Sequence, residues 1–182
     1  MVDIPFNGPG TLDDITGDWI VAVYDPKTAH GSGVATTWND QSTASGIPAN
    51  QGGMYCSLCM NHPSHSPTQG SPIPMLDYGT HVLVTYPKKK VSVVTELIDL
   101  GPALSTGAPI DLTGDVKKVL GVKEDQNILV EFDVLATPTP ASVWLDQIKK
   151  FKQNNHLDVV RNSLVQFRRL FPKVQIPDDL TS

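Results

Sequence analysis

Alternation of apolar and polar side chains marks the middle of the chain as a series of β-strands. Residues 81–86 alternate through β-branched and aromatic side chains, and residues 91–98 resume the pattern after three consecutive lysines. Residues 127–134 show the same two-residue period, which is typical of half-buried strands. Residues 18–24 and 33–38 are predicted as strands as well. The pattern therefore indicates a β-rich body.

The ends of these elements place two carboxylates. Gly101-Pro102 must end the strand that begins at residue 91, because proline fixes φ and glycine permits a turn, so Asp99 is expected at the strand end. Asp111 precedes a short predicted helix that Thr113 or Asp115 can cap. Both carboxylates are therefore expected at the ends of secondary-structure elements.

Helical spacing appears only near the end of the chain. Apolar residues recur at helical intervals in 141–154 and in 156–171, after a proline-rich connector. These two amphipathic helices are expected to form a hairpin that covers one open end of a barrel. The alternative is that residues 141–171 bind a protein partner.

The stretch from Gln51 to Met75 has almost no periodicity and is expected to be a functional loop. It contains two cysteines and two histidines at short intervals: Cys56, Cys59, His62 and His65. Thiolate and imidazole suit zinc, but this spacing is tighter than that of usual zinc sites. A disulfide or two free thiols are favoured, so no metal and no cofactor are predicted. Either histidine could instead stand beside a binding groove as a proton donor or as a side chain that binds the ligand.

Composition narrows the class of protein. The 182 residues carry a net charge of −5, with 15 prolines and 14 glycines, which suits a globular barrel with many turns. The only basic cluster is Lys88–Lys90, so nucleic acid and anionic membrane surfaces are disfavoured. No apolar run is long enough to span a bilayer. The first residues lack a signal-peptide pattern, so the protein is expected inside the cell, or outside it or in the periplasm if a leader was removed.

Several short motifs, in this order, resemble one family. They are Gly33-Val34-Ala35-Thr36-Thr37-Trp38, Thr43-Ala44-Ser45-Gly46, Tyr78-Gly79-Thr80, Ile98-Asp99-Leu100-Gly101-Pro102 and Ile110-Asp111-Leu112-Thr113. Together they resemble the double-psi β-barrel of the rare lipoprotein A domain and of expansins, over about residues 31–135.

The resemblance implies a fold and a ligand. The expected fold is all-β with C-terminal helices: a six-stranded double-psi β-barrel plus a C-terminal helical hairpin. The chain would divide into an N-terminal arm with the first strand, the barrel, and the connector with the hairpin, at residues 1–30, 31–135 and 136–182. The implied ligand is peptidoglycan or another cell-wall polysaccharide, bound in a groove.

The resemblance also assigns roles to residues. Asp111 falls on the family's essential acid, Asp99 on the aspartate of its Asp-Arg-Gly-Pro motif, and Thr36 or Thr37 on a groove hydroxyl. Leu100 replaces the arginine and Ile47 replaces a glutamate of rare lipoprotein A. These departures favour a non-catalytic, expansin-like alternative.

Lytic transglycosylase chemistry needs a single acid, because the 6-hydroxyl of the sugar replaces water as the nucleophile. We expect Asp111 to be that acid, with Asp99 positioning substrate or raising the pKa of Asp111 by its negative charge. The structural alternative is that Asp111 caps the helix and Asp99 accepts hydrogen bonds from backbone amides. A scaffold in a secretion or phage-type assembly is the third hypothesis.

Four aromatic residues are candidates for a platform that stacks against sugar rings: Trp38, Tyr55, Tyr78 and Tyr86. Taken singly, each is also a plausible core or rim residue. Glu96 is a reserve acid. Strand alternation predicts that Glu96 and Ile98 share one face and that Asp99 takes the other.

Overall fold

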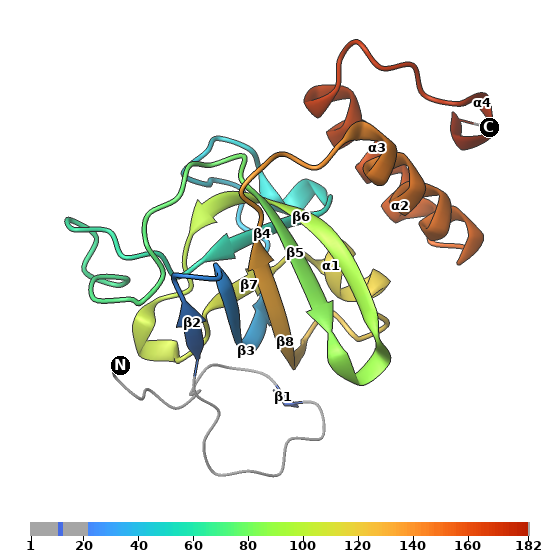
Figure 1. Ribbon diagram of the computed structural model, residues 1–182. Helices are drawn as coiled ribbons and strands as arrows, with labels where there is room; N and C mark the ends of the chain where they lie inside the picture. The colour runs from blue at the N-terminus through green and yellow to red at the C-terminus, as the bar shows by residue number, and fades with distance from the viewer. Residues whose placement is uncertain (1–10, 13–21, 182) are drawn as a thin grey trace.

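Six strands form a closed barrel in the computed structural model, which describes residues 11–12 and 22–181 (Figure 1). They are β3 (His30–Thr37), β4 (Tyr55–Leu58), β5 (His81–Tyr86), β6 (Val91–Leu100), β7 (Ile110–Leu112) and β8 (Gln126–Val134). The strands follow the order β8-β5-β6-β4-β7-β3, and pairing of β3 with β8 closes the barrel. The predicted six-stranded barrel with C-terminal helices is confirmed.

The strand pairings are mixed in direction. β3 pairs with β7, and β4 with β6, in parallel, whereas the other pairs of barrel strands are antiparallel. This topology is compatible with a double-psi barrel. Outside the barrel, β2 (Val23–Asp25) lies antiparallel to β3, and β1 (Thr11–Leu12) pairs in parallel with β8. The predicted arm and the strand at 18–24 lie outside the described residues, apart from Thr11–Leu12 and residues 22–24.

Two barrel strands were not predicted. β4 lies inside the stretch that was expected to be a loop, and all four of its residues are buried, so no alternation marks it. β7 has only three residues, all buried, and it contains Asp111, which was expected in a loop before the helix. The short helices are η1 (Ala49–Gln51), η2 (Pro87–Lys89), η3 (Leu104–Thr106) and α1 (Gly114–Val119).

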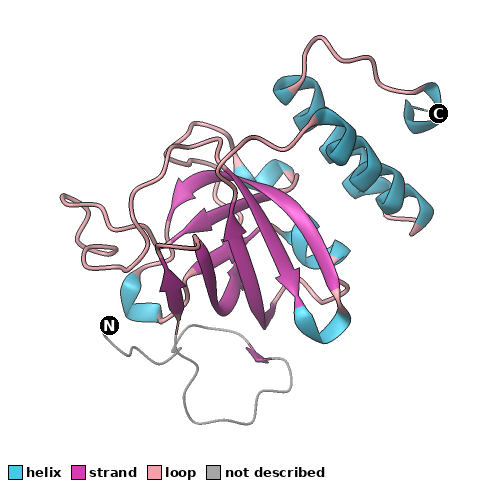
Figure 2. Ribbon diagram, in the orientation of Figure 1, coloured by secondary structure: helices cyan, strands magenta, loops and turns pink. Residues whose placement is uncertain are grey.

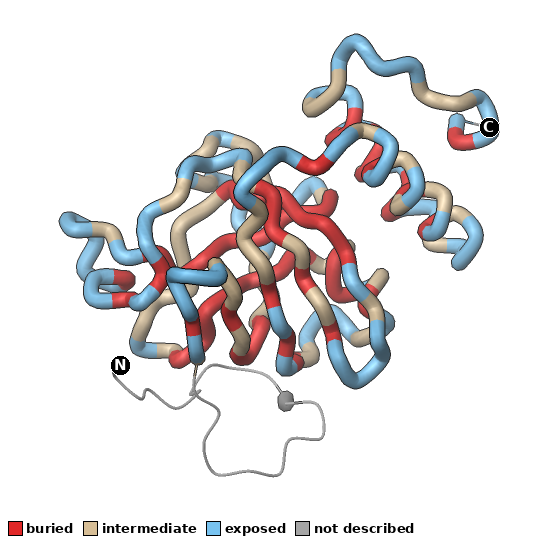
Figure 3. The backbone as a smooth tube through the Cα atoms, in the orientation of Figure 1, coloured by how far each residue is buried: buried red, intermediate tan, exposed pale blue. Residues whose placement is uncertain are grey.

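The barrel is filled by apolar side chains from every strand, and the buried parts of the chain follow its wall (Figure 3). Phe132 of β8 is fully buried there and lies opposite Gly31 of β3. A Cβ atom at Gly31 would overlap the ring of Phe132. Glycine at this position therefore allows the ring to lie across the neighbouring strand.

Substitution of Gly31 by Ala is expected to destabilise the fold by about 1–3 kcal/mol, because the added methyl group displaces a buried ring. Chemical denaturation would measure the loss. Ser32→Ala in the same strand is the matched control and should change stability by less than about 0.5 kcal/mol. A Gly31→Ala protein as stable as the wild type would contradict this view of the packing.

The C-terminal helices lie together beside the barrel (Figures 1 and 2). They are α2 (Ala141–Gln153), α3 (Leu157–Leu170) and the short α4 (Asp178–Thr181). Trp144, Ile148 and Phe167 belong to the same apolar cluster as the barrel interior. The apolar stripes of the hairpin thus pack against the protein's own core.

Two glutamines hold this hairpin to the barrel wall. The Gln147 side chain exchanges two hydrogen bonds with the backbone of Val94, at 2.8 and 3.1 Å. The Gln166 side chain does the same with the backbone of Met54, again at 2.8 and 3.1 Å. Each amide thereby satisfies a backbone donor and acceptor at the barrel surface. None of the helices in the described part of the chain is long and apolar enough to cross a membrane.

Candidate functional site

A row of four polar side chains crosses four adjacent strands. Thr36 of β3 pairs with Asp111 of β7, Asp111 pairs with Ser57 of β4, and Ser57 pairs with Asp99 of β6. Residues in register on neighbouring strands point to the same face of a sheet. The barrel thus brings together residues from four separate parts of the sequence, including both predicted carboxylates.

The row faces away from the barrel interior. The residues on either side of Asp111, Ile110 and Leu112, are in the core cluster, and so are Cys56 and Leu58 on either side of Ser57. Since successive side chains of a strand alternate between faces, Asp111 and Ser57 point outward. They lie on the outer face of the barrel wall, although both are buried.

Asp111 is nevertheless well enclosed, with only 8 % of its surface exposed. Thr36 Oγ1 donates a hydrogen bond to Oδ1, and Ser57 Oγ donates one to Oδ2 at 3.3 Å. Burial raises the pKa of the Asp111 carboxyl from 3.8 to about 6, although both hydroxyl hydrogen bonds act to lower it. The carboxyl can therefore hold or release a proton near neutral pH. Its oxygens are bound by hydroxyls of neighbouring strands, not by helix amides, so the predicted capping role is not seen.

Two further charges act on Asp111. The negative charge of Asp40 raises the pKa of Asp111 and the positive charge of Lys117 lowers it. The expected effect of Asp99 on this pKa is not found; the acidic neighbour that acts is Asp40, which is exposed on the loop after β3. Sequence reasoning had not singled out Asp40.

Lys117 is fully buried, although it carries a charge. It comes from α1, and its Nζ donates hydrogen bonds to the carbonyl oxygens of Ala35, at 2.8 Å, and Gln126, at 2.6 Å. Burial lowers the pKa of the Lys117 ammonium from 10.5 to about 8, against the opposing influence of Asp111. Ala35 immediately precedes Thr36, so this lysine secures the strand that supplies one of the hydroxyls on Asp111.

Asp99 is bound differently. Its Oδ1 accepts hydrogen bonds from the backbone N–H groups of Ala44 and Leu100, each at 2.9 Å. This matches the structural alternative of backbone capping, and it ties the loop after β3 to the end of β6. A bulge in the pairing of β4 with β6 makes Ile98 the extra residue, so Asp99 and not Ile98 lies opposite Ser57. The predicted alternation fails here for that reason.

The aromatic candidates separate into exposed and buried side chains. Tyr78 is 36 % exposed, and the charge of Asp99 adds to the effect of burial in raising the pKa of its phenol, which places it beside that carboxylate. Trp38 is half-buried against Ile98 and Tyr55. Tyr86 and Tyr55 are only 2 % and 6 % exposed. Neither of these two tyrosines can serve as a platform, because each is packed under other side chains.

Thr37 and Glu96 are engaged elsewhere. Thr37 Oγ1 donates to the carbonyl oxygen of Glu124, away from Asp111. Glu96 is buried, forms an ion pair with Arg169 of α3 and accepts a hydrogen bond from Gln166 at 3.1 Å. Its role as a reserve acid is therefore not supported, because both partners belong to the helix that covers it.

Cys56, Cys59, His62 and His65 do not gather into one group of side chains. No group of three or more His, Cys, Asp or Glu side chains that could hold a metal occurs among residues 11–12 and 22–181. Cys56 is a free thiol in the core, and burial raises its pKa to about 12. The His62 and His65 rings lie edge to face, with centroids 6.3 Å apart. Among the described side chains, no hydrogen bond joins either imidazole to Asp99 or Asp111.

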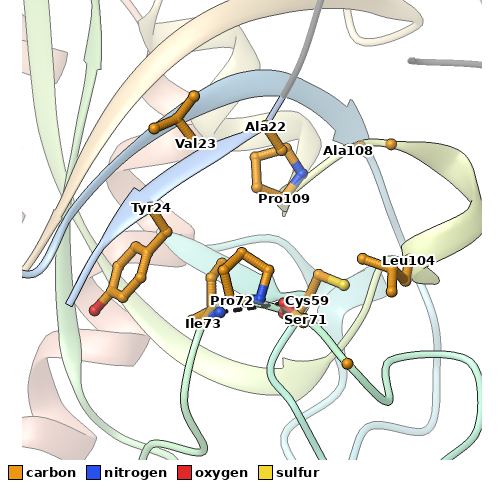
Figure 4. A pocket seen from close by; sticks show the side chains of 12 residues that line it. Ala22, Val23, Tyr24, Cys59, Ser71, Pro72, Ile73, Leu104, Ala108 and Pro109 are labelled. Atoms are coloured by element: carbon orange, nitrogen blue, oxygen red, sulfur yellow. Dashed lines mark hydrogen bonds between the residues drawn. The ribbon is translucent and has the colours of Figure 1, made fainter. Parts of the chain in front are cut away.

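Cys59 is also a free thiol, and burial raises its pKa. It lines a narrow pocket together with Tyr24, Ile73, Leu104 and Pro109, and its sulfur points toward Leu104 (Figure 4). The other side chains around the sulfur are mostly apolar, and Ser71 forms a hydrogen bond with it. The predicted alternative of two free thiols matches the structure.

Three residues that contact or influence Asp111 were missed from the sequence: Asp40, Ser57 and Lys117. A serine inside a strand that shows no alternation carries no signal of its own. A lysine on the apolar face of a short helix could have been noticed, because lysine is almost never fully buried without partners. No protein-family model matches the chain, and no curated protein matches it either.

Proposed function

We propose that this protein acts on a cell-wall polysaccharide, with peptidoglycan as the leading substrate and Asp111 as its single acid and base. One observation carries the proposal: an outward-facing carboxyl, almost buried, fixed by two hydroxyls, with a pKa raised to about 6. A general acid works best when its pKa lies near the operating pH. Perturbed carboxyls of this kind gather at functional sites.

Lytic transglycosylase chemistry fits one carboxyl. Asp111 gives its proton to the glycosidic oxygen as the bond from that oxygen to C1 breaks, and the positive charge that develops at C1 is met by the resulting carboxylate. The 6-hydroxyl of the same sugar then bonds to C1 and returns its proton to Asp111. The products are two shorter chains. One carries the new free hydroxyl and the other ends in a 1,6-anhydro sugar, so no water is consumed.

Further support comes from the resemblance to the rare lipoprotein A and expansin barrels. The closed mixed barrel is compatible with that family's double-psi fold. Thr36, Asp99 and Asp111 match the family's motifs, and they fall into one row across the sheet. Tyr78 beside Asp99 offers an exposed ring for a sugar.

Digestion of purified peptidoglycan sacculi tests this proposal. The protein is expected to release muropeptides with 1,6-anhydro ends, detected by mass spectrometry. Sacculi incubated without the protein give the background. If the protein binds sacculi but releases nothing above that background, the enzymatic proposal is wrong.

The second candidate is a non-catalytic, expansin-like binding module. It is favoured by Asp99, whose Oδ1 is already occupied by the amides of Ala44 and Leu100, and by leucine at position 100 in place of the family's arginine. Such a protein would sediment with insoluble peptidoglycan or cellulose and release no soluble sugar. The scaffold hypothesis loses its main motivation, because the apolar stripes of α2 and α3 are packed against the barrel.

A further inference from the structure

A polar hollow lies where the loop after β3, α1 and α3 meet. Its lining includes Asn39 from the loop, Asn50 and Gln51 from η1 within that loop, Asp115 and Lys118 from α1, and Asp158 and Asn162 from α3. We call it the loop–helix hollow. Its volume is about 460 Å³, within the range of small-molecule sites. Neither Asp99 nor Asp111 is among the residues that line it.

One wall of the hollow is built rigidly. Asp115 Oδ2 accepts hydrogen bonds from Gly53 N–H at 2.7 Å and from Asn162 Nδ2 at 2.8 Å. Gly52 has φ +77°, and a Cβ there would stand 2.6 Å from Asp115 Oδ2 and would also overlap Asn162. The loop can approach the two helices so closely only because glycine occupies this position.

The rest of the lining offers unused hydrogen-bonding groups. Within residues 22–181, the side-chain amides of Asn39, Asn50 and Gln51 make no hydrogen bond, and all three residues are exposed. Each amide presents an acceptor oxygen and two donor hydrogens, which suits a ligand rich in hydroxyl groups.

Charge selects among such ligands. Asp115, Glu124 and Asp158 stand against one lysine, Lys118, which is already paired with Asp158. Three carboxylates against one ammonium leave the lining negative. Anionic ligands are therefore repelled, whereas neutral sugars are not.

The hollow extends toward the end of β3, where Thr37 follows Thr36. A second concavity shares Asn39 and Glu124 with it and adds Trp38. The backbone N–H of Trp38 donates to the carbonyl oxygen of Leu112 at 3.2 Å, one residue after Asp111. Trp38 therefore lies next to the strand that carries Asp111, and its half-buried side chain lines the second concavity, where an indole can stack on a sugar ring.

We propose that the loop–helix hollow is a subsite for neutral, hydroxyl-rich sugar units of a chain that extends past Trp38 from Asp111. The inference rests on the proposed function and deepens it by naming the part of the substrate bound at α3. Asn39, Asn50 and Gln51 hydrogen-bond the sugar hydroxyls, and Asn162 and Asp115 fix the wall.

Titration of the ¹⁵N-labelled protein with chitotetraose, followed by NMR, tests the subsite without relying on cleavage. We expect side-chain amide shifts at Asn39, Asn50 and Gln51. The double variant Asn50→Ala/Gln51→Ala should bind about tenfold more weakly, since each lost hydrogen bond costs about 0.5–1.5 kcal/mol. Gln153→Ala, an exposed amide at the end of α2, is the matched control and should bind as the wild type does.

The outcomes separate this inference from the proposed function. NMR shifts of the amides in the hollow, together with no release of muropeptides from sacculi, would support the subsite and contradict the catalytic proposal. Shifts confined to residues near Asp111, or unchanged affinity in the double variant, would overturn the subsite alone. Tetragalacturonate, an anionic tetrasaccharide, should bind more weakly than chitotetraose; equal or tighter binding would overturn the selection for neutral sugars. If none of these sugars binds, the subsite is overturned as well.

Discussion

Asp111→Asn is expected to abolish glycan cleavage while stabilising the fold at neutral pH. Loss of a general acid typically costs 10²–10⁴-fold in rate. The stability gain follows from the carboxyl's pKa, which burial raises from 3.8 to about 6. Between these values the folded protein holds a proton that the unfolded chain has released, so wild-type stability falls as the pH rises from 3.8 through 6. Asparagine does not ionise, so the variant avoids this loss of stability, which is about 2–3 kcal/mol at pH 7.

Urea denaturation at pH 7 and at pH 3.5 measures the effect. The gain should be present at pH 7 and nearly absent at pH 3.5, where the carboxyl is largely protonated in both states. Asp77→Asn, at an exposed carboxyl, is the control and should leave both activity and stability close to wild type. An equal gain at the two pH values would show that burial of a charge at Asp111 is not its cause.

Lys117→Met is expected to change both the pH dependence of stability and the pKa of the Asp111 carboxyl. The folded-state pKa of Lys117 is lowered from 10.5 to about 8. Between these values the unfolded chain binds the extra proton, so this lysine makes wild-type stability rise with pH, by at most about 3 kcal/mol. The stability of the variant should not show this rise with pH. It should also show a higher pKa for the Asp111 carboxyl, because a positive charge that lowers it is gone.

Denaturation between pH 7.5 and 10.5 gives the first readout, and ¹³C NMR of the Asp111 carboxyl gives the second. The exposed Lys123→Met is the matched control and should change neither. The carbonyls of Ala35 and Gln126 lose their donor in Lys117→Met, so some overall destabilisation is expected as well. An unchanged Asp111 titration in a folded variant would contradict the electrostatic link between the two groups.

Alternation and helical spacing were sufficient to predict the long strands and both C-terminal helices. β5, β6, β8, α2 and α3 were each expected within a few residues of their observed bounds. β4 and β7 could not be found in this way, since burial on both faces removes alternation and three residues are too few to show a period. Stretches without pattern therefore concealed the two central strands that carry Ser57 and Asp111.

The candidate site was predictable residue by residue but not as an arrangement. The motifs pointed to Thr36, Asp99 and Asp111, yet the pairings that align them run between strands that are distant in sequence. The bulge at Ile98 and the burial of Tyr86 depend on packing that no local pattern encodes. The same holds for the charge of Asp40 at Asp111, which arises from the path of the loop after β3.

The four-strand row also bears on how this protein can change over evolutionary time. Thr36, Ser57, Asp99 and Asp111 come from separate strands and meet only through the barrel pairings, so no excised fragment could carry the acid centre to another scaffold. The loop after β3, by contrast, contacts Asp99 through the Ala44 amide without supplying any member of the row. Under the proposed function, insertions or replacements in this loop would change which glycan is bound while Asp111 stays in place.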